Sequence, residues 1–247
     1  MQVLTFDFHN TLANCDPWFD LEVRDLPSAV IDHLRIPLGE ASKDLVDTAY
    51  RRLRLDVITS GNEIDAYDAV SLVLAGLDIP ADRQAVELAI DELMFECTGA
   101  MRPVAGAVET VRHLHGSGVK LGVVSSAVHH QTLEWILDTL GIASCFDAVV
   151  TSASSGYYKS TAAIFHAALD RLDGDLATSV HVGDSLRWDV ATAQQAGLTA
   201  VWLKTPRRET FASTAPVATP DLTLESLEDA GPVLIDLLAR IRVPANA

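Results

Sequence analysis

The pattern of apolar and polar positions divides the chain into three parts, of which the first is a short strand at the N-terminus. Residues 3–6 form an apolar run rich in β-branched and aromatic side chains, and the polar residues Asp7, His9, Asn10 and Thr11 follow it. Such a run is typical of a buried strand. Open parallel α/β sheets bind ligands at the carboxyl ends of their strands, which makes Asp7 a candidate site residue. Its carboxylate can serve as a nucleophile or a metal ligand, or it can simply close a turn.

The second part, residues 15–100, carries its apolar residues at helical spacing. Leu45, Ala49 and Leu53 recur every four residues, which predicts that they share one face of a helix. Further helices are predicted over 64–77 and 81–97. Such a block, inserted directly behind the first strand, predicts an α-helical cap domain over 15–100; the alternative is that it belongs to the main body.

The third part alternates between helices and strands. The pattern predicts helices over 107–115, 131–140, 161–172 and 190–196, strands over 119–124, 146–150, 179–183 and 199–203, a polar loop over 207–220 and a final helix over 231–241. Alternation of this kind requires a mostly parallel sheet with helices on both faces. The predicted fold is therefore α/β, a Rossmann-like doubly wound sheet formed by residues 1–14 and 101–247, with the helical cap inserted.

Composition narrows the classes of function. The formal net charge of −16 over 247 residues argues against binding to nucleic acid or to an anionic membrane, because phosphate groups would be repelled. No apolar run is long enough to cross a bilayer, and the chain enters its first strand without a basic leader, so we expect a cytoplasmic protein. Cys15, Cys97 and Cys145 are scattered, which indicates reduced thiols rather than a disulfide framework or a zinc site.

Polar side chains follow several of the predicted strands: Asp7, Ser125, Lys159, Asp184 and Asp189. In a doubly wound sheet these positions converge on one crevice. Carboxylates without His or Cys at ligand spacing favour Mg²⁺, and a lysine with a hydroxyl suits the oxygens of a phosphoryl group. Each residue also has a simpler interpretation, since Ser125 can cap a helix and Lys159 or Asp189 can be solvated surface charges.

In their combination these segments resemble the four motifs of the haloacid dehalogenase-like hydrolase superfamily, over essentially the full chain. Residues 7–12 are similar to the first motif, 123–126 to the second, 156–159 to the third and 182–189 to the fourth. The resemblance implies a Rossmann-like core with a cap between the first and second motifs. It also implies a phosphatase that acts on a small phosphorylated metabolite through an aspartyl-phosphate.

The resemblance assigns a role to each matching residue. Asp7 would attack phosphorus, and Ser125 and Lys159 would hold the phosphoryl oxygens. Asp7, the backbone carbonyl of His9 and Asp184 would bind Mg²⁺, with Asp189 in support.

Four further residues are candidates for binding the substrate. Thr11 and Ser126 belong to the motif segments, while Arg51 and Arg54 lie in the densest cationic cluster before the second motif. These arginines could reach an anionic substrate tail, or they could form a solvated helix face paired with acids. An apolar cap face could cover the core or pair with a second copy, so both a monomer and a homodimer remain open.

His9 is the main departure from the family pattern, because phosphatases of the family usually carry a second Asp two residues after the nucleophile as general acid and base. Imidazole can shuttle a proton near neutral pH, so we predict a catalytic role for His9; the alternative is a spacer without a proton role. Two other functions stay open: a 2-haloacid dehalogenase, which uses the same aspartate without a metal, and a non-catalytic protein that binds phosphate or another ligand.

Overall fold

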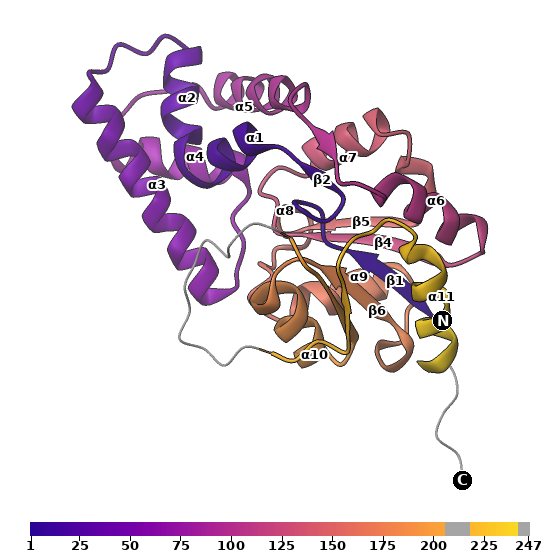
Figure 1. Cartoon of the computed structure of the whole chain (residues 1–247). Helices are drawn as coiled ribbons and strands as arrows, with labels where there is room; N and C mark the ends of the chain where they lie inside the picture. The colour runs from indigo at the N-terminus through magenta and orange to yellow at the C-terminus, as the bar shows by residue number, and fades with distance from the viewer. Residues whose placement is uncertain (206–217, 242–247) are drawn as a thin grey trace.

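The computed structural model describes residues 1–205 and 218–241, so the loop predicted over 207–220 lies outside the described residues except for 218–220. Six parallel strands form the main sheet of this part of the chain (Figure 1). They are β1 (Val3–Phe6), β4 (Lys120–Ser125), β5 (Ala148–Thr151), β6 (Val180–Gly183), β7 (Thr199–Leu203) and β8 (Leu222–Leu224). Their spatial order is β5-β4-β1-β6-β7-β8.

Strand β1 lies in the interior of this sheet and sets the register for its neighbours. Phe6 pairs with Val123 of β4 on one side and with Val182 of β6 on the other. All residues of β1 are buried, as expected of a strand covered on both faces. Because the strands are parallel and in register, the residues after β1, β4 and β6 emerge at the same edge of the sheet.

Helices cover both faces of the sheet, which confirms the predicted doubly wound fold (Figure 1). On one face, Leu4 of β1 shares a hydrophobic core with Val111 of helix α6. On the other face, Val3 shares a second core with Phe165 of α9 and Ala193 of α10. The helices are α6 (Ala107–Gly116), α7 (His130–Thr139), α8 (Ser152–Ser155), α9 (Ala163–Arg171), α10 (Thr192–Ala196) and α11 (Ala230–Ile241).

Residues between the first strand and the rest of the sheet form a block of helices at one end of the molecule (Figure 1). Its elements are α1 (Asp16–Asp20), the π-helix η1 (Leu21–Asp25), α2 (Leu26–His33), α3 (Glu40–Ser60), α4 (Ala66–Gly76) and α5 (Arg83–Thr98). The chain enters and leaves the block through two short strands, β2 (Ala13–Asn14) and β3 (Arg102–Pro103), which pair antiparallel. This arrangement supports our proposal that residues 15–100 form a cap on a core of residues 1–14 and 101–247.

The helical block contacts the core around the segment that follows β4. The amide N–H of Ala66 donates to the carbonyl of Val128 at 2.9 Å, and the carboxylate of Glu22 accepts from the N–H of Val128 at 2.8 Å. Nearby, the hydroxyl of Tyr67 lies 2.6 Å from Asp91 and 2.9 Å from the buried ring of His129. The block is therefore joined to the core by polar contacts as well as by a continuous hydrophobic core.

Of the three apolar residues predicted to share one face of α3, Ala49 and Leu53 are partly buried and pack against the core, while Leu45 does not. The side chain of Leu45 is on the surface, with 62% of the residue exposed, whereas Val46, Tyr50 and Arg54 are buried. The inward face thus also includes polar groups, since Tyr50 donates a hydrogen bond to the backbone carbonyl of Glu22 and Arg54 forms a buried ion pair. A pattern of apolar residues alone does not reveal a helix face that buries polar groups.

Three other features were not predicted. Strand β8 extends the sheet after β7, α8 forms a single turn directly after β5 in the chain, and the helix expected over 190–196 is preceded by a π-helix, η4 (Leu186–Ala191).

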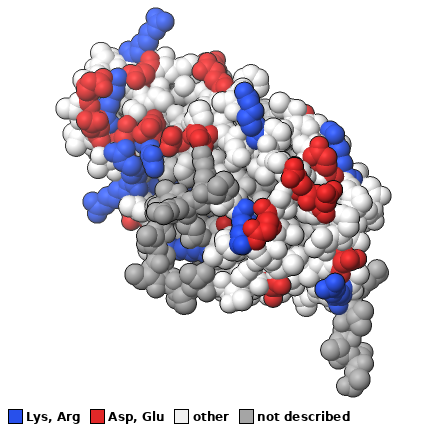
Figure 2. All heavy atoms as spheres, in the orientation of Figure 1, with Lys and Arg blue, Asp and Glu red and all other residues white. Residues whose placement is uncertain are grey.

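Within residues 1–205 and 218–241, no helix combines the length and the apolar character needed to cross a membrane. On the face drawn in Figure 2, basic side chains are interspersed with acidic ones.

Gly106→Ala should destabilise the fold. Gly106 precedes α6 with φ of 77°, and an added Cβ would lie 2.3 Å from the amide nitrogen of Glu228. We expect a loss of about 1–3 kcal/mol in the free energy of unfolding, measured by urea denaturation. Gly116→Ala at the other end of α6 is the matched control, because its Cβ would meet nothing within 4 Å. Equal effects of the two substitutions would contradict this account.

Candidate functional site

The residues at the carboxyl edge of the sheet surround one cavity of about 210 Å³. Asp7 comes from the end of β1, Ser125 from the end of β4, and Asp184 and Asp189 from the segment after β6. Lys159 comes from the loop between α8 and α9. The structure therefore brings together these five residues, which the sequence separates by up to 182 positions.

Lys159 lies between two of these carboxylates. Its buried ammonium donates to Oδ1 of Asp7 and, at 2.6 Å, to Oδ1 of Asp189. Burial alone would lower the pKa of Lys159, but the charges of Asp189 and Asp7 outweigh burial and raise it. Lys159 is therefore a fixed positive charge in the lining of the cavity.

Asp189 is held by three donors. Besides Lys159, the N–H of Ser185 donates to Oδ2 at 2.8 Å, and Nε2 of His181 lies 3.3 Å from Oδ1. Because an ionised carboxylate only accepts hydrogen bonds, Nε2 carries the ring proton, and Nδ1 accepts from the hydroxyl of Thr5 at 2.9 Å. Burial would raise the pKa of Asp189, but Lys159 and His181 hold it below its ordinary range.

The local backbone explains how Asp189 reaches this position. A Cβ at Gly183 would lie 2.2 Å from Cγ of Asp189, so only glycine leaves room for the carboxylate. Sequence reasoning missed His181, because a histidine inside an apolar strand looks like an ordinary buried residue.

Asp7 is fixed by its backbone and by both carboxylate oxygens. Its N–H donates to the carbonyl of Val182 at 2.8 Å, and the hydroxyl of Thr11 donates to Oδ2 at 3.1 Å. Burial, together with the charge of Asp189, raises the pKa of Asp7 to about 6, although Lys159 opposes this shift. Thr11 is fully buried, donates to Asp7 and is not among the described residues that line the cavity.

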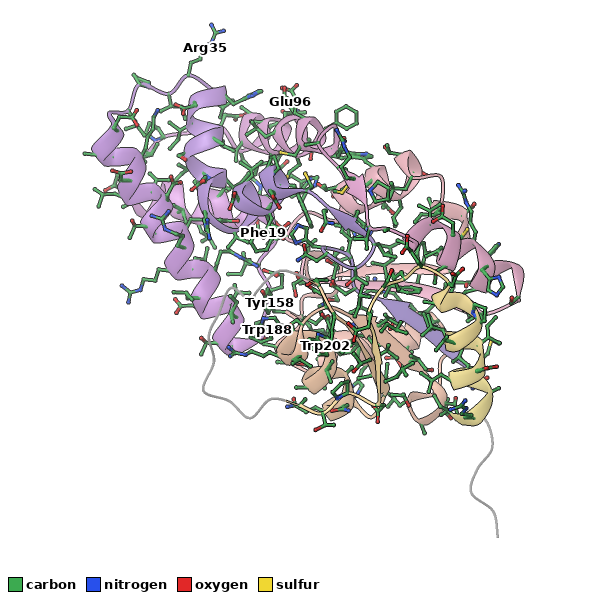
Figure 3. The ribbon with its side chains drawn as sticks, in the orientation of Figure 1. Phe19, Arg35, Glu96, Tyr158, Trp188 and Trp202 are labelled. Carbon is green, nitrogen blue, oxygen red and sulfur yellow. The ribbon has the colours of Figure 1, made fainter. Side chains whose placement is uncertain are left out.

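Asp184 completes a cluster of three carboxylates. One oxygen each from Asp7, Asp184 and Asp189 lie within 4.8 Å of one another. Burial and then the charges of Asp7 and Asp189 raise the pKa of Asp184 to about 8, although Lys159 opposes this shift. Trp202, labelled in Figure 3, donates from its ring to the backbone carbonyl of Asp184 at 2.8 Å. The cluster fits a hard divalent cation that prefers oxygen ligands.

His9 lies where the core meets the helical block. Its ring stacks on Phe19 of α1, with centroids 4.9 Å apart and planes 5° apart, and meets the edge of Trp18 at 5.6 Å. All three side chains line the cavity. The imidazole is therefore held by aromatic contacts beside Asp7.

The two predicted arginines have different positions. Arg54 lines the cavity, but its guanidinium pairs with both carboxylate oxygens of Glu63, at 2.5 and 3.1 Å, and the pair is almost fully buried. Arg51 is not among the described lining residues; its side chain is 45% exposed and lies 3.9 Å from Asp25. Helix geometry explains the difference, because Tyr50 and Arg54 share the inward face of α3 while Arg51 points away from it. Ser126 lines the cavity beside Ser125.

Glu22 is a lining residue that sequence reasoning missed. It belongs to the π-helix η1, and its Oε1 accepts from the N–H of Val128 at 2.8 Å. Burial raises the pKa of Glu22 to about 8, with smaller opposing effects from Val128 and Arg54. An acidic residue within a helical segment usually lies on the solvated face, so the sequence carries no signal of its burial; the π-helix, a form often found at functional sites, is visible only in the structure.

A parallel sheet that presents Asp7, Lys159 and two further carboxylates in one buried cavity defines an α/β enzyme that acts at the carboxyl ends of its strands. The family of haloacid dehalogenase-like hydrolases matches residues 1–197, and the chain belongs to this family of hydrolases. The resemblance of its four motifs to that superfamily is thereby confirmed.

Several curated relatives carry phosphatase names. The chain is 26% identical to glyceraldehyde 3-phosphate phosphatase of Methanothermobacter thermautotrophicus over 81% of this chain and 84% of that protein. It is 25% identical to phosphoglycolate phosphatase of Caulobacter vibrioides over 98% and 94%. With haloacid dehalogenase-like hydrolase domain-containing protein 3 of Bos taurus it shares 34% identity over 47% of each chain, so the match spans about half of that relative.

Solved structures share the fold. A 2-haloacid dehalogenase from Pseudomonas syringae pv. Tomato DC3000 superposes with a TM-score of 0.67 at 23% identity, covering 96% of this chain and 99% of that one. A HAD phosphatase from Thermococcus onnurineus gives a TM-score of 0.61 at 22% identity, covering 95% and 98%. Both chemistries therefore occur on this fold, and the residues of the site must decide between them.

Glu22→Gln should remove a pH dependence of stability. The pKa of Glu22 is raised from 4.5 to about 8 in the folded chain, so its proton stabilises the fold fully below pH 4.5, and this contribution is lost as the pH rises towards 8. Between about pH 5 and about pH 8 the variant should therefore gain a few kcal/mol in the free energy of unfolding relative to the wild type, measured by urea denaturation.

The matched control is Glu40→Gln, whose side chain is 89% exposed at the start of α3. This variant should follow the wild type at each pH. If Glu22→Gln also follows the wild type, Glu22 does not hold its proton in the folded chain.

Proposed function

We propose that this hydrolase is a Mg²⁺-dependent phosphatase of a small phosphorylated metabolite and that Asp7 is its nucleophile. The observation that carries the proposal is the position of Asp7, whose carboxylate lies against Lys159 and within 4.8 Å of the oxygens of Asp184 and Asp189. A nucleophile beside a fixed cation and a cation-binding cluster suits phosphoryl transfer. The phosphatase names of the relatives support the same chemistry.

Asp7, Asp184 and the backbone carbonyl of His9 would hold the Mg²⁺, with Asp189 in support. The raised pKa values of Asp7, about 6, and Asp184, about 8, are consistent with this, because burial first and the neighbouring carboxylates second disfavour the ionised forms, and a bound cation would favour them. When bound, Mg²⁺ neutralises charge on the transferring phosphoryl group.

The reaction would then proceed in two displacement steps. The ammonium of Lys159 and the hydroxyl of Ser125 hold phosphoryl oxygens while a carboxylate oxygen of Asp7 attacks phosphorus. The bond to the alcohol oxygen breaks, and His9 gives that oxygen a proton. In the second step His9 takes a proton from water, the water oxygen attacks the aspartyl-phosphate, and inorganic phosphate leaves with Asp7 regenerated.

Asp189 acts as a positioning residue in this scheme. It fixes Lys159 from the side opposite to Asp7, and His181 and Ser185 fix Asp189 in turn. Thr11 has a similar part through its hydrogen bond to Asp7. Ser126, next to Ser125 in the cavity lining, would contact substrate.

The 2-haloacid dehalogenase chemistry is the second candidate, since the same fold supports it and His9 is not acidic. The carboxylate cluster argues against it: displacement of halide by an aspartate needs no metal, and Asp184 beside Asp7 would then be an uncompensated repulsion. We therefore favour the phosphatase.

We further propose that residues 15–100 act as the cap that selects the substrate and that the protein works in the cytoplasm as a monomer or homodimer. The cavity supports the first point, because Trp18, Phe19 and Glu22 of the helical block line it together with core residues. The three cysteines are free, as predicted, which fits a reducing compartment.

Asp7→Asn should abolish phosphate release. With Mg²⁺ present, the wild type should hydrolyse 4-nitrophenyl phosphate, and the variant should lose at least about a thousandfold in kcat because an amide is a poor nucleophile. Omitting Mg²⁺ should likewise suppress hydrolysis of 4-nitrophenyl phosphate by the wild type. Retained turnover by Asp7→Asn would refute the nucleophile, and metal-independent halide release from 2-chloropropionate would favour the dehalogenase instead.

His9→Ala should slow turnover and flatten the pH profile. Removing a general acid and base typically lowers the rate by about 10²–10⁴-fold. We expect the loss in kcat for 4-nitrophenyl phosphate, measured between about pH 5 and about pH 9, to be accompanied by the loss of one limb of the profile. His9→Asp should restore part of the rate. An unchanged rate and profile in His9→Ala would mean that His9 has no proton role.

A further inference from the structure

The described residues that line the cavity carry more acidic than basic side chains. The acids are Asp7, Glu22, Asp184 and Asp189, and the bases are Arg54 and Lys159. Even with a divalent cation bound, positive charge in this lining would do no more than balance the acids. Whether any positive charge is left to bind the organic part of a substrate depends on the ion pairs that Arg54 and Lys159 already form.

Both bases are already committed to acids. Lys159 lies between Asp7 and Asp189, at the end of the cavity where phosphoryl chemistry is proposed. Arg54 lies in the helical block, but both its terminal nitrogens contact the carboxylate of Glu63, whose side chain is only 1% exposed. Within the described lining, neither base has positive charge to spare for a second anionic group.

Glu22 adds an acid to the part of the lining contributed by the helical block. It is buried, one carboxylate oxygen is held by Val128, and the other has no hydrogen-bond partner among the described residues. The pKa of about 8 shows that this environment already resists one negative charge. A neutral or cationic group next to Glu22 would be accommodated, whereas a further anion would lose its water without a compensating charge.

Aromatic side chains form much of the remaining lining. Figure 3 shows Phe19, Tyr158 and Trp188 one after another where the helical block meets the core, and all three line the cavity with Trp18. The rings of Tyr158 and Trp188 meet edge to face, with centroids 6.0 Å apart. Such surfaces favour flat or apolar groups and cations.

We propose that the cavity selects phosphate monoesters whose organic part is neutral or cationic and presents an apolar or aromatic surface, and that Glu22 is a specificity-determining residue that disfavours a second anionic group. This inference rests on the proposed phosphatase function and concerns the same cavity. It separates the chain from reactions such as phosphoglycolate hydrolysis, in which the substrate carries a carboxylate beside its phosphate.

The test compares three aryl phosphates that differ in the charge at one end. Phenyl phosphate is neutral there, 4-carboxyphenyl phosphate is anionic and 4-(aminomethyl)phenyl phosphate is cationic. With Mg²⁺ and the full chain, at a pH above about 8 where Glu22 is ionised, kcat/KM for the anionic ester should lie about tenfold or more below that for phenyl phosphate, because like charges repel strongly in a buried site. The cationic ester should equal or exceed phenyl phosphate.

The variant Glu22→Gln tests whether Glu22 causes this preference. At a pH above about 8 Glu22 is ionised, whereas glutamine retains a carbonyl that can accept from Val128 but carries no charge. At that pH the ratio of kcat/KM between the cationic and anionic esters should fall at least about threefold in the variant, mainly through KM. A merely structural role would change all three esters alike. Glu40→Gln, on the exposed side of the helical block, is the matched control and should leave the ratio at its wild-type value.

The outcomes separate failure of the inference from failure of the proposed function. Release of phosphate from all three esters at similar rates, or faster from the anionic ester, overturns the inference and leaves the phosphatase intact. An unchanged ratio in Glu22→Gln removes Glu22 as its cause. Absence of phosphate release from every ester in the presence of Mg²⁺ contradicts the phosphatase itself.

Discussion

The structure depends above all on the buried contact of Lys159 with Asp7 and Asp189. Its members come from three segments of the chain, with Lys159 152 residues from Asp7 and 30 from Asp189. Removing one member of such a group typically costs about 3–5 kcal/mol, because a buried charge is left uncompensated. The parallel register of β1 and β6, the missing side chain at Gly183 and the hydrogen bond from His181 all serve to bring these charges together.

In the function we propose, chemistry and substrate choice would be divided between the two parts of the chain. Asp7, Lys159 and Asp184 belong to the sheet and its loops, whereas Glu22 and Arg54 reach the same cavity from the helical block. The N–H of Val128, in the segment that follows Ser125, donates to the carboxylate of Glu22 and so joins the helical block to the core. A change in the helical block can therefore alter the surroundings of the substrate without moving the carboxylate cluster.

The sequence predicts those structural features that depend on neighbouring residues in the chain, and it does not predict those that depend on distant contacts. Strands such as β7 and the polar residues after β1, β4 and β6 are visible because an apolar run and the residue that ends it are adjacent in the chain. The polar groups on the inward face of α3, such as Arg54, and the burial of Glu22 were not predictable in this way. Each depends on contacts from elsewhere, such as Val128, 106 residues from Glu22, and no spacing of apolar residues records them.

The pairing of β2 with β3 has a consequence for how such a chain can change over evolution. Ala13 lies opposite Pro103 and Asn14 opposite Arg102, so the chain departs from the sheet and returns to it at adjacent points. The pairing of β2 with β3 holds the two ends of the inserted segment together, whatever lies between them. An insertion anchored in this way can be lengthened, shortened or exchanged while the sheet keeps its strand order, so the same carboxyl edge of the sheet can be combined with many different insertions.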